Sequence, residues 1–312
     1  MIKLIIQIPC YNEEKTLLTT LNDLPKSIRG VDCIEVVVIN DGSKDKSAEI
    51  ARSWGATVLD IKINKGLANA FRSGLQKSLE LGADIIVNTD ADNQYSAKDI
   101  ERLIQPLLNN QADITIGARD ISNIKDFSPL KKFLQKLGSC VLRLFSDTQV
   151  KDAPSGFRAF TKDAALRLNV FDNYTYTMET LIQAGAKGMK VVSVPISVNP
   201  KLRESRLVKS MFDYIFKSMK TTIRMFIVYR PFRFFITLAT IIGLIGILLI
   251  IRFLYFYYIG AGNGHIQSLI FASIFLITSV QLSITAIVGD LLSINRKLLE
   301  DIQTRVKKIE LK

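Results

Sequence analysis

The chain has 312 residues, of which 48% are hydrophobic and 22% are charged, a composition that excludes an intrinsically disordered protein. Three widely separated cysteines exclude a disulfide framework or a cysteine-based zinc site, and a reduced compartment fits them best. The formal net charge of +12 is compatible with acidic lipids, phosphate ligands or nucleic acid, and the position of the charge decides between them.

The first 200 residues alternate strand-like and helix-like segments. The strand candidates are rich in Ile and Val, and the first three are continuous apolar runs typical of buried parallel strands. Asp45 and Ser96 are expected N-caps, and Gly82 is an expected helix stop. This alternation predicts an α/β fold with helices on both faces of a mostly parallel sheet. The predicted strands are 3–8, 34–40, 57–61, 84–89, 113–117 and 191–198, and the predicted helices are 13–24, 46–54, 67–81 and 97–108.

Polar residues follow four of the predicted strands at the point where each strand ends. In an open α/β sheet, ligands bind outside the carboxyl ends of the strands. A single Asp-Gly-Ser segment favours an ordinary turn or cap, but four polar sets at the same edge indicate a ligand site. The four sets are Pro9-Cys-Tyr-Asn-Glu13, Asn40-Asp-Gly-Ser43, Asp90-Ala-Asp-Asn-Gln-Tyr95 and Gly117-Ala-Arg119.

Most of the excess positive charge lies in residues 201–233, which carry nine Lys and Arg against two acids. Because this segment directly precedes a very apolar stretch, it indicates a membrane surface more than DNA. Apolar residues in 207–229 follow helical spacing with a basic border, which predicts one or two interfacial helices. A packing helix of a soluble domain is the alternative.

Two uncharged runs follow, 234–251 and 266–289, joined by a Gly-rich connection at 260–264. Their 18 and 24 residues are long enough to cross a bilayer as helices. A buried hairpin in a soluble protein is the alternative. Basic residues on both outer flanks predict a multi-pass protein of the cytoplasmic (inner) membrane, with both termini and the first 200 residues in the cytosol. The apolar run at 4–8 is too short for a signal peptide.

Four motifs resemble those of family 2 glycosyltransferases with the GT-A fold. They are Pro9-x-Tyr11-Asn12-Glu13, Asp41-Gly42-Ser43, Lys65-Gly66 and Asp90-Ala91-Asp92. The basic segment and the paired apolar runs narrow the resemblance to polyprenyl-phosphate sugar transferases, the group similar to dolichol-phosphate mannose synthase. The resemblance covers essentially the whole chain. It implies a GT-A nucleotide-diphospho-sugar transferase domain followed by amphipathic interfacial helices and two transmembrane helices.

The activity that the resemblance implies is inverting transfer of a hexose from a GDP-mannose or UDP-glucose type of donor to undecaprenyl or dolichyl phosphate. A hard cation, Mg²⁺ or Mn²⁺, would neutralise the donor diphosphate. Asp90, Asp92 and Gln94 alternate at one strand end, so their oxygens can converge on one ion. The implied nucleotide site comprises Pro9, Tyr11, Asn12, Glu13, Asp41, Lys65, Asp90 and Ala91, with a solvated loop lysine as the alternative for Lys65.

Tyr95 is one departure from the family pattern, since many relatives have His there, and Asn93 replaces the more familiar Leu. Both departures leave the implied metal ligands in place, but they leave undecided which nucleotide sugar is the donor. The sequence therefore does not select between UDP and GDP.

The acceptor side is expected in three places. Ser155-Gly-Phe-Arg158 matches the subgroup pattern that lines the sugar and acceptor site, and residues 199–206 resemble its Arg-x-x-Ser-Lys loop. Glu179 occupies the position of an acidic residue near the reaction centre, with an ordinary first-turn acid of a helix as the alternative. Asp92, Glu179 and Arg119 are the catalytic candidates. The candidates for binding lipid phosphate and donor diphosphate are Arg119, Ser155, Arg158, Arg203, Ser205 and Arg206, with a solvated basic face as the alternative.

A phosphate acceptor removes the need for a strong general base. Its second pKa lies near ~6, so the attacking oxygen is largely anionic at neutral pH. The single histidine, His265, falls in the loop assigned to the far side of the membrane and is therefore not expected to be catalytic.

These expectations divide the chain into a cytosolic GT-A domain (1–200), a basic juxtamembrane segment (201–233), a transmembrane hairpin (234–289) and a cytosolic tail (290–312). The expected partners are a UDP or GDP sugar, polyprenyl phosphate and membrane lipids, without nucleic acid and with homo-oligomerisation left open. The alternatives are UDP-N-acetylhexosamine or amino-sugar transfer to the same lipid, and a non-catalytic membrane scaffold. A processive polysaccharide synthase should carry Gln-x-x-Arg-Trp, but the single tryptophan is Trp54.

Overall fold

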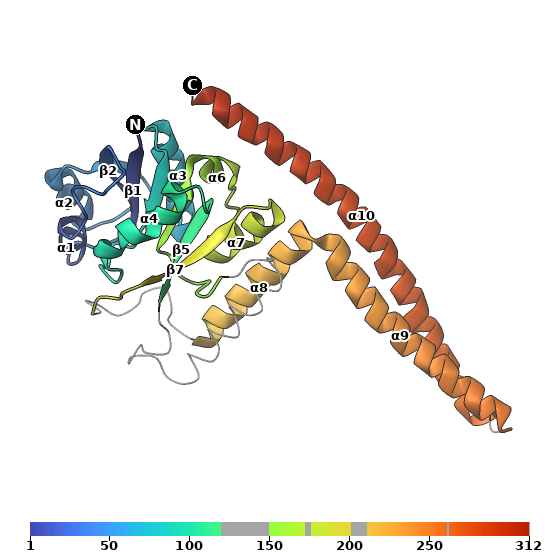
Figure 1. The fold of residues 1–312 in the computed structure, drawn as a ribbon. Helices are drawn as coiled ribbons and strands as arrows, with labels where there is room; N and C mark the ends of the chain where they lie inside the picture. The colour runs from blue at the N-terminus through green and yellow to red at the C-terminus, as the bar shows by residue number, and fades with distance from the viewer. Residues whose placement is uncertain (120–149, 172–175, 201–210, 261, 312) are drawn as a thin grey trace. The chain divides into compact units, whose positions relative to one another are not determined.

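The structure is a computed structural model that describes residues 1–119, 150–171, 176–200, 211–260 and 262–311 (Figure 1). The chain divides into two compact units. The first contains Met1–Ile223 and Gln303–Lys312, and the second contains Arg224–Ile302. The domain boundaries expected at residues 200 and 233 stay predictions.

The first unit is built around one seven-stranded sheet. Its strands are β1 (Lys3–Cys10), β2 (Cys33–Asp41), β3 (Thr57–Ile61), β4 (Ile85–Asn88), β5 (Ile114–Arg119), β6 (Arg158–Thr161) and β7 (Val191–Ile196). Their order in the sheet is β3-β2-β1-β4-β6-β5-β7. All neighbouring pairs are parallel except those of β6, which is antiparallel to β4 and to β5. The predicted α/β architecture is confirmed.

The helices of this unit lie on both faces of the sheet. They are α1 (Leu17–Asn22), α2 (Ser47–Trp54), α3 (Leu67–Glu80), the short η1 (Ala97–Asp99), α4 (Ile100–Leu108), α6 (Lys162–Arg167) and α7 (Thr177–Ala186). Asp45 accepts a hydrogen bond from the N–H of Ser47, the first residue of α2, but the N-cap position is Lys46 and not Asp45 as predicted. Gly82 ends the turn after α3 with a φ of +78°, which a glycine adopts without strain. Ser96 precedes η1 but makes no side-chain capping bond.

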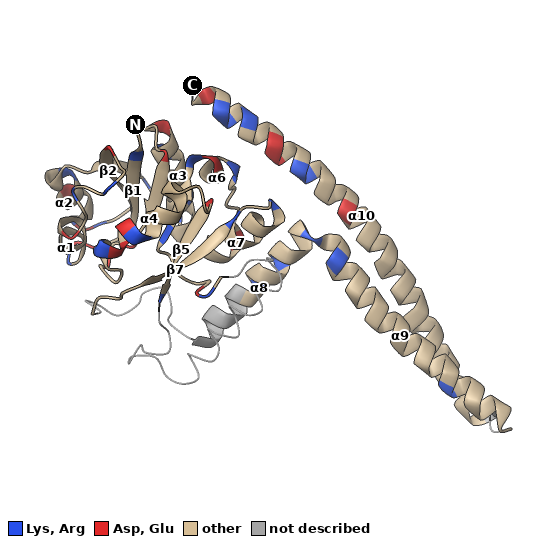
Figure 2. Ribbon diagram, viewed as in Figure 1, with Lys and Arg blue, Asp and Glu red and all other residues tan. Residues whose placement is uncertain are grey.

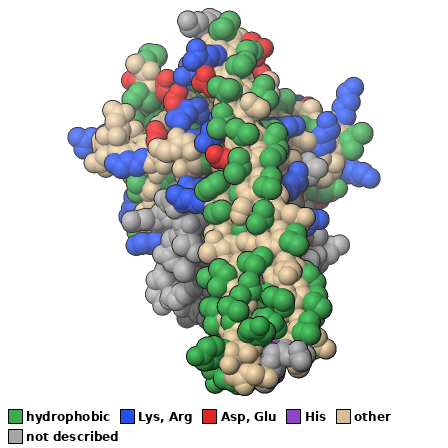
Figure 3. All heavy atoms as spheres, turned by 90° about the vertical axis from the view of Figure 1, so that its right-hand side faces the viewer, with side chains coloured by type: hydrophobic (Ala, Val, Ile, Leu, Met, Phe, Trp, Pro, Cys, Tyr) green, Lys and Arg blue, Asp and Glu red, His purple; other side chains and the backbone are tan. Residues whose placement is uncertain are grey.

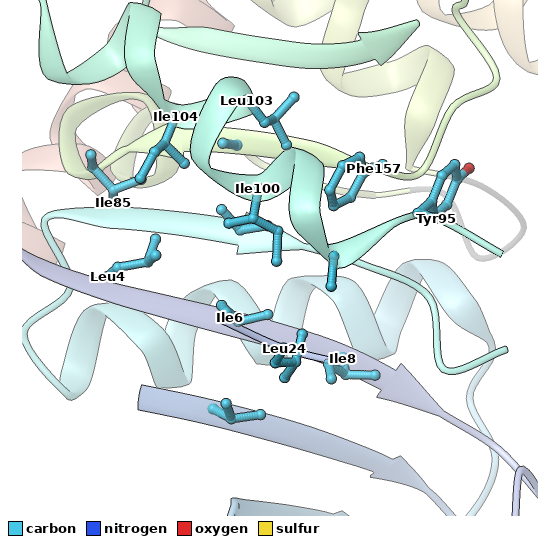
Figure 4. Packing of buried hydrophobic residues seen from close by; sticks show 14 of the residues in the cluster. Leu4, Ile6, Ile8, Leu24, Ile85, Tyr95, Ile100, Leu103, Ile104 and Phe157 are labelled. Carbon is cyan, nitrogen blue, oxygen red and sulfur yellow. The ribbon is translucent and has the colours of Figure 1, made fainter. Parts of the chain in front are cut away.

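The core explains why β1 is a continuous apolar run. Seven of its eight residues are buried, because helices cover both faces. Leu4 and Ile6 pack in one cluster with Ile100, Leu103 and Ile104 of α4 (Figure 4). On the other face, Gly74 of α3 approaches β1 and β2 so closely that an added Cβ would lie 2.6 Å from Gln7 Oε1.

The second unit contains two long helices, α9 (Pro231–Tyr258) and α10, joined by the short η2 (Gly262–His265). Helix α10 runs from Ile266 to Glu310, so its last residues belong to the first unit. Both helices are long and apolar enough to cross a membrane, and the predicted spans 234–251 and 266–289 lie inside them. Charged residues are sparse along both helices until the C-terminal part of α10 (Figure 2). Hydrophobic side chains cover the visible face of these helices (Figure 3). Before them, α8 (Met211–Tyr229) falls within the predicted interfacial segment.

Small residues let α9 and α10 pack closely. A Cβ added at Gly243 would lie 2.8 Å from Ser279 Oγ, and one at Gly289 would lie 2.8 Å from Pro231. The Ser279 hydroxyl donates to the Ala239 carbonyl oxygen at 2.8 Å, which links the two helices by a hydrogen bond. Such small-residue contacts are typical of helices that associate in a bilayer.

Candidate active site

The predicted polar sets meet at the carboxyl edge of the sheet. Strands β1, β2 and β4 are parallel neighbours, so their C-terminal ends lie at the same edge. Direct hydrogen bonds hold together the loops at this edge. These bonds make one continuous surface out of motifs that are far apart in the sequence.

The loop after β1 is bonded to the loop after β2. The Asn12 N–H donates to Ser43 Oγ at 3.0 Å, and Asn12 Oδ1 accepts from the Lys44 N–H at 2.8 Å. Asn12 has a φ of +54°, a left-handed conformation that Asn tolerates better than most residues. Pro9 and Glu13 are buried, whereas Tyr11 remains 40% exposed and is therefore accessible to a ligand.

Asp41 organises the second part of the edge. Its carboxylate oxygens accept hydrogen bonds from the Lys65 and Gly66 N–H groups, both at 2.9 Å. Gly42 lies against the same loop, because an added Cβ would be 2.7 Å from the Asn64 nitrogen. Lys65 itself is exposed to solvent. The motifs around Asp41 and Lys65, which are predicted to bind the nucleotide, are thus brought together, with the Asp41 carboxylate bonded to the loop that carries Lys65.

Residues 90–95 form the loop after β4, which we name the metal loop because it carries the predicted metal ligands. Asp90, Asp92 and Gln94 are half-buried, and the residues between them are buried, so the loop alternates as predicted. Helix α1 and the residue before it hold this loop in place. The Thr16 and Thr20 hydroxyls both donate to the Ala91 carbonyl oxygen, at 2.9 and 3.0 Å.

The structure gives a reason for asparagine at position 93, where the family pattern more often has leucine. It has a φ of +55°, and its Nδ2 donates to Asp23 Oδ2 at 2.8 Å. A leucine would adopt this left-handed conformation only at a cost and could not make the bond. The residue therefore fixes the turn between Asp92 and Gln94.

The metal loop offers oxygen ligands that suit a hard cation. Two carboxylates and one amide alternate along it, and the Gln94 N–H donates to Asp92 Oδ1 at 3.1 Å. Within the described ranges there is no cluster of three or more His, Cys, Asp or Glu able to hold an ion without further ligands. Mg²⁺ typically takes one or two carboxylates and completes its shell with water and substrate phosphates. The donor set therefore fits Mg²⁺ or Mn²⁺ bound together with a diphosphate.

The loop before β6 closes against the metal loop. A Cβ added at Gly156 would lie 3.0 Å from Tyr176 Oη and 3.2 Å from Asp90 Oδ1, so any larger residue would push these groups apart by a few tenths of an ångström. The Gly156 N–H donates to Tyr95 Oη at 3.1 Å. Asn88 Nδ2 donates to the Gly156 carbonyl oxygen and to Tyr176 Oη, both at 2.9 Å.

Both tyrosines beside Asp90 stay protonated over the physiological range. Burial raises the pKa of Tyr95 to about 12; Arg119 opposes this shift, and the nearby Asp90 carboxylate adds a smaller increase. Burial and Asp90 also raise the pKa of Tyr176 well above its usual value. Each hydroxyl therefore acts as a neutral hydrogen-bonding group, and neither is a base at neutral pH.

Arg158 is fully buried beneath this loop. Its guanidinium donates to the carbonyl oxygens of Ala153 (2.7 Å), Ser155 (2.8 Å) and Thr177 (2.9 Å) and to Thr180 Oγ1 (2.7 Å). Burial lowers the pKa of Arg158 to about 10, so the side chain is still charged at neutral pH. Four of its five N–H groups are thus used inside the fold. The phosphate-binding role expected of Arg158 stays a prediction.

Arg119 pairs with Asp152 at the end of β5. The guanidinium makes a bidentate contact, with Nε 2.7 Å from Oδ2 and Nη2 3.0 Å from Oδ1. Asp152 is completely buried, and the Arg119 side chain is 9% exposed. Close by in the chain, the buried Ser155 hydroxyl has no hydrogen-bond partner among the residues that the structure describes.

Glu179 lies in the first turn of α7 and is completely buried. Its two carboxylate oxygens accept from the Phe171 N–H, at 3.0 and 3.1 Å. This contact ties α7 to the segment after α6. The catalytic role expected for Glu179 stays a prediction.

The remaining acceptor candidates, Arg203, Ser205 and Arg206, lie outside the described residues.

Several residues that shape the site were not predicted from the sequence. Asp152, Asn88, Tyr176, Thr16 and Thr20 come from separate places in the chain. The sequence offers one signal for such a supporting residue: a polar residue at the end of an apolar strand, as Asn88 is in β4.

Comparison with known proteins agrees with this geometry. The profile described as "Glycosyl transferase family 2" matches residues 5–168. The UDP-N-acetylglucosamine–dolichyl-phosphate N-acetylglucosaminyltransferase of Methanococcus voltae is 34% identical over 212 residues, which is 61% of this chain and 82% of that protein. The undecaprenyl-phosphate mannosyltransferase of Micrococcus luteus is 28% identical over 212 residues, or 64% of this chain and 85% of that protein.

Solved structures show the same fold. A crystal structure of glucosyl-3-phosphoglycerate synthase from Mycobacterium tuberculosis, in complex with Mn²⁺, UDP and glucosyl-3-phosphoglycerate, matches with a TM-score of 0.55 and 18% identity. The match covers 72% of this chain and 78% of that one. Together with the sheet order and the loops at its carboxyl edge, the profile match over more than half of the residues shows that the chain belongs to glycosyl transferase family 2 and is a glycosyltransferase of the GT-A fold.

Proposed function

We propose that the protein transfers a hexose, with inversion, from a nucleotide sugar to a polyprenyl phosphate in the membrane. The observation that carries this proposal is the convergence of the nucleotide loops and the metal loop at one sheet edge, in a chain that also has two apolar helices of membrane-spanning length. The relatives named for transfer to dolichyl or undecaprenyl phosphate support the acceptor class.

The donor nucleotide would bind over the ends of β1 and β2. Tyr11 is exposed, whereas Glu13 and Asp41 are buried, so the Tyr11 ring can pack on a base or ribose. Asp41 would read the base edge, and Lys65 would approach the nucleotide from the adjoining loop. Asp90, Asp92 and Gln94 would hold Mg²⁺ or Mn²⁺, which supplies positive charge to the leaving diphosphate.

The acceptor is expected on the side of the Gly156 loop. A phosphate monoester is already largely anionic near pH 7, so its oxygen attacks the anomeric carbon without a strong base. The new bond joins that oxygen to the anomeric carbon, and the bond to the donor diphosphate breaks with its electron pair on the nucleoside diphosphate. The Ser155 hydroxyl is completely buried and has no hydrogen-bond partner among the described residues. Because buried polar groups are normally paired, we assign this hydroxyl to the substrate. We assign Arg203 and Arg206 to the lipid phosphate. The buried Arg158 and Arg119–Asp152 contacts support positioning roles for those arginines.

N-acetylhexosamine is the alternative sugar, because the 34%-identical relative named above uses UDP-N-acetylglucosamine by its name. The orientation proposed from the charges is a multi-pass protein of the cytoplasmic membrane, with the catalytic unit in the cytosol.

The decisive experiment incubates the purified full-length chain with UDP- and GDP-linked hexoses and N-acetylhexosamines, each with undecaprenyl or dolichyl phosphate and Mn²⁺. We expect one donor to yield a lipid-linked sugar together with an equal amount of nucleoside diphosphate. Nucleoside diphosphate release that does not depend on the lipid phosphate would contradict the proposed acceptor.

A further inference from the structure

Two loops of the site meet neighbouring strands at the same place. The ladder between β4 and β6 ends where Asn88 pairs with Arg158. The metal loop follows β4 and starts with Asp90, while residues 152–157 lead into β6. We name residues 152–157 the serine loop, because they include Ser155, whose hydroxyl is assigned to the substrate. The distance between the metal loop and the serine loop is therefore set close to Asn88, the last residue of β4.

The Asn88 side chain joins the serine loop to β4 where main-chain pairing has ended. Its Nδ2 donates to the Gly156 carbonyl oxygen and to Tyr176 Oη, both at 2.9 Å. The Tyr176 hydroxyl donates to the same carbonyl oxygen at 3.2 Å. An amide nitrogen carries two hydrogens, so it serves both acceptors at once. Asn88 and Tyr176 are completely buried, so water does not compete for these bonds.

Gln7 fixes the orientation of the Asn88 amide. It is completely buried in β1, where it pairs with Asn88 of β4. Its Nε2 donates to Asn88 Oδ1 at 2.9 Å, which leaves the Asn88 nitrogen to bind Gly156. Gln7 Oε1 has no hydrogen-bond partner among the described residues. Burying an unpaired amide oxygen is unfavourable, so the bond to Asn88 is what a polar side chain gains at this position.

Gly156 in turn lies against the first predicted metal ligand. A Cβ added there would be 3.2 and 3.3 Å from the two carboxylate oxygens of Asp90. The Gly156 N–H donates to Tyr95 Oη in the metal loop, and the Phe157 ring stacks on the Tyr95 ring at 5.2 Å. The Arg158 guanidinium, by contrast, binds carbonyl oxygens of the serine loop itself. A change at Asn88 therefore alters the contact between the two loops without removing a bond inside either one.

We propose that Asn88 is a positioning residue that fixes the distance between the serine loop and the metal loop. Through Gly156 it holds Ser155 at a set distance from Asp90, so that the acceptor oxygen and the anomeric carbon of the donor meet in line. The inference deepens the proposed function and rests on it, because it takes a lipid phosphate as the acceptor.

A wrong distance between the loops would let water replace the acceptor. The water oxygen then forms the new bond to the anomeric carbon, and a proton is lost to solvent. The bond to the donor diphosphate breaks with its electron pair on the nucleoside diphosphate, and free sugar is released. The hydrolysed fraction, which is the share of nucleoside diphosphate formed without lipid-linked sugar, therefore reports the distance between the loops.

The test compares the full-length wild type in detergent with Asn88→Leu, which keeps the size of the side chain but cannot donate to Gly156. Lipid-linked sugar and nucleoside diphosphate are measured with undecaprenyl or dolichyl phosphate and the donor that the wild type uses. We expect transfer to fall about tenfold or more, since small misplacements of reacting groups are costly, and the hydrolysed fraction to rise. The affinity for Mn²⁺ and UDP should stay within about twofold of the wild type, because the bonds of Thr16 and Thr20 to the metal loop remain.

Two further variants make the test specific. Gln7→Met keeps the Asn88 amide but frees its orientation, so it should raise the hydrolysed fraction by a smaller amount, and it carries the test if Asn88→Leu does not fold. Thr115→Val is the matched control, because Thr115 is completely buried in β5 and its hydroxyl has no partner among the described residues. It should keep the hydrolysed fraction of the wild type.

A purely structural role for Asn88 would lower the unfolding temperature and reduce transfer, hydrolysis and Mn²⁺–UDP binding in parallel. That result, or an unchanged hydrolysed fraction in Asn88→Leu and Gln7→Met, would overturn the proposal. If the wild type releases nucleoside diphosphate equally well without lipid phosphate, the proposed acceptor is wrong. Amide hydrogen exchange then decides the role of Asn88: exchange at residues 155–157 should be faster in Asn88→Leu, with exchange at residues 90–95 unchanged, and equal exchange at 155–157 would overturn the proposal.

Discussion

Asp92 combines accessibility with a fixed backbone, which makes it the best residue for a test of the metal site. It is half-buried in the metal loop, and Oδ1 accepts from the Gln94 N–H. Asp92→Asn keeps the shape of the side chain but removes its charge. We expect sugar transfer to fall by about a hundredfold or more, since a metal supplies several kcal/mol of charge stabilisation, and the unfolding temperature to stay unchanged.

The measurement is the initial rate of lipid-linked sugar formation over a Mn²⁺ titration. Glu101→Gln, on the exposed surface of α4, controls for the loss of one negative charge. Full activity of Asp92→Asn, or of the wild type in excess chelator, would show that the metal assignment is wrong.

Arg158 allows a test of whether a buried motif residue binds phosphate or supports the fold. The Ser-Gly-Phe-Arg pattern suggested a phosphate ligand, but the guanidinium donates to three carbonyl oxygens and one hydroxyl inside the fold. Arg158→Lys should therefore act mainly on stability, because one ammonium cannot reach all four acceptors. We expect the free energy of unfolding to fall by about 3–5 kcal/mol, the range for a broken buried charged network.

Thermal unfolding of the full chain in detergent measures this effect, and Arg102→Lys, whose side chain is 63% exposed, is the matched control. If Arg158→Lys leaves the unfolding temperature unchanged but raises the KM for the lipid phosphate, the residue binds phosphate and the positioning role is wrong.

At the scale of the elements, the helices and strands that could be predicted are those marked by hydrophobic periodicity and by turn or cap residues. Six of the seven strands and the first four helical segments were predicted, because long apolar runs and caps are local signals. Strand β6 was missed: its four residues begin with a charged arginine, and only tertiary contacts bury that side chain. The predicted helix at 13–24 begins only at Leu17, because Asn12 turns left-handed and Thr16 binds the metal loop.

The same limit applies to the site. The motif residues around Asp41 and Asp90 could be predicted, since they follow recognisable strands. Their supports could not, because the Asn88–Tyr176 and Arg119–Asp152 contacts join residues that are 88 and 33 positions apart. No local pattern carries that information.

The contact between α9 and α10 gives a prediction at the scale of the helix pair. Gly243→Leu places a side chain where even a Cβ would be 2.8 Å from Ser279 Oγ. We expect the hairpin to lose about 1–3 kcal/mol of stability, the usual range for overpacking. Unfolding in mild detergent, followed by loss of helical circular dichroism, measures the change. Gly264→Leu is the control, since an added Cβ there meets nothing within 4 Å, and equal effects of the two variants would contradict close packing at Gly243.

The whole molecule must bring a water-soluble donor and a lipid acceptor to one site. The distribution of charge suits this requirement, because residues 201–233 carry a net +7, while Arg252 is the single charge in 234–289. The apolar side chains of α9 and α10 are exposed in large number, as expected of helices that face lipid. An anionic cytoplasmic leaflet would attract the basic segment and place it at headgroup depth.

This distribution predicts the orientation of the chain, which labelling of single cysteines can test. Cys33 and Cys140 are first replaced by serine. Cys10 can remain, because it is buried and burial raises the pKa of its thiol to about 12, so it stays unreactive. In this background, a cysteine at Asn263 should react with a membrane-impermeant maleimide added to intact cells. A cysteine at Lys308 should react only after the membrane is permeabilised, since basic flanks stay on the cytosolic side. The opposite pattern would separate the catalytic unit from cytosolic nucleotide sugars, and the proposed donor would then be wrong together with the orientation.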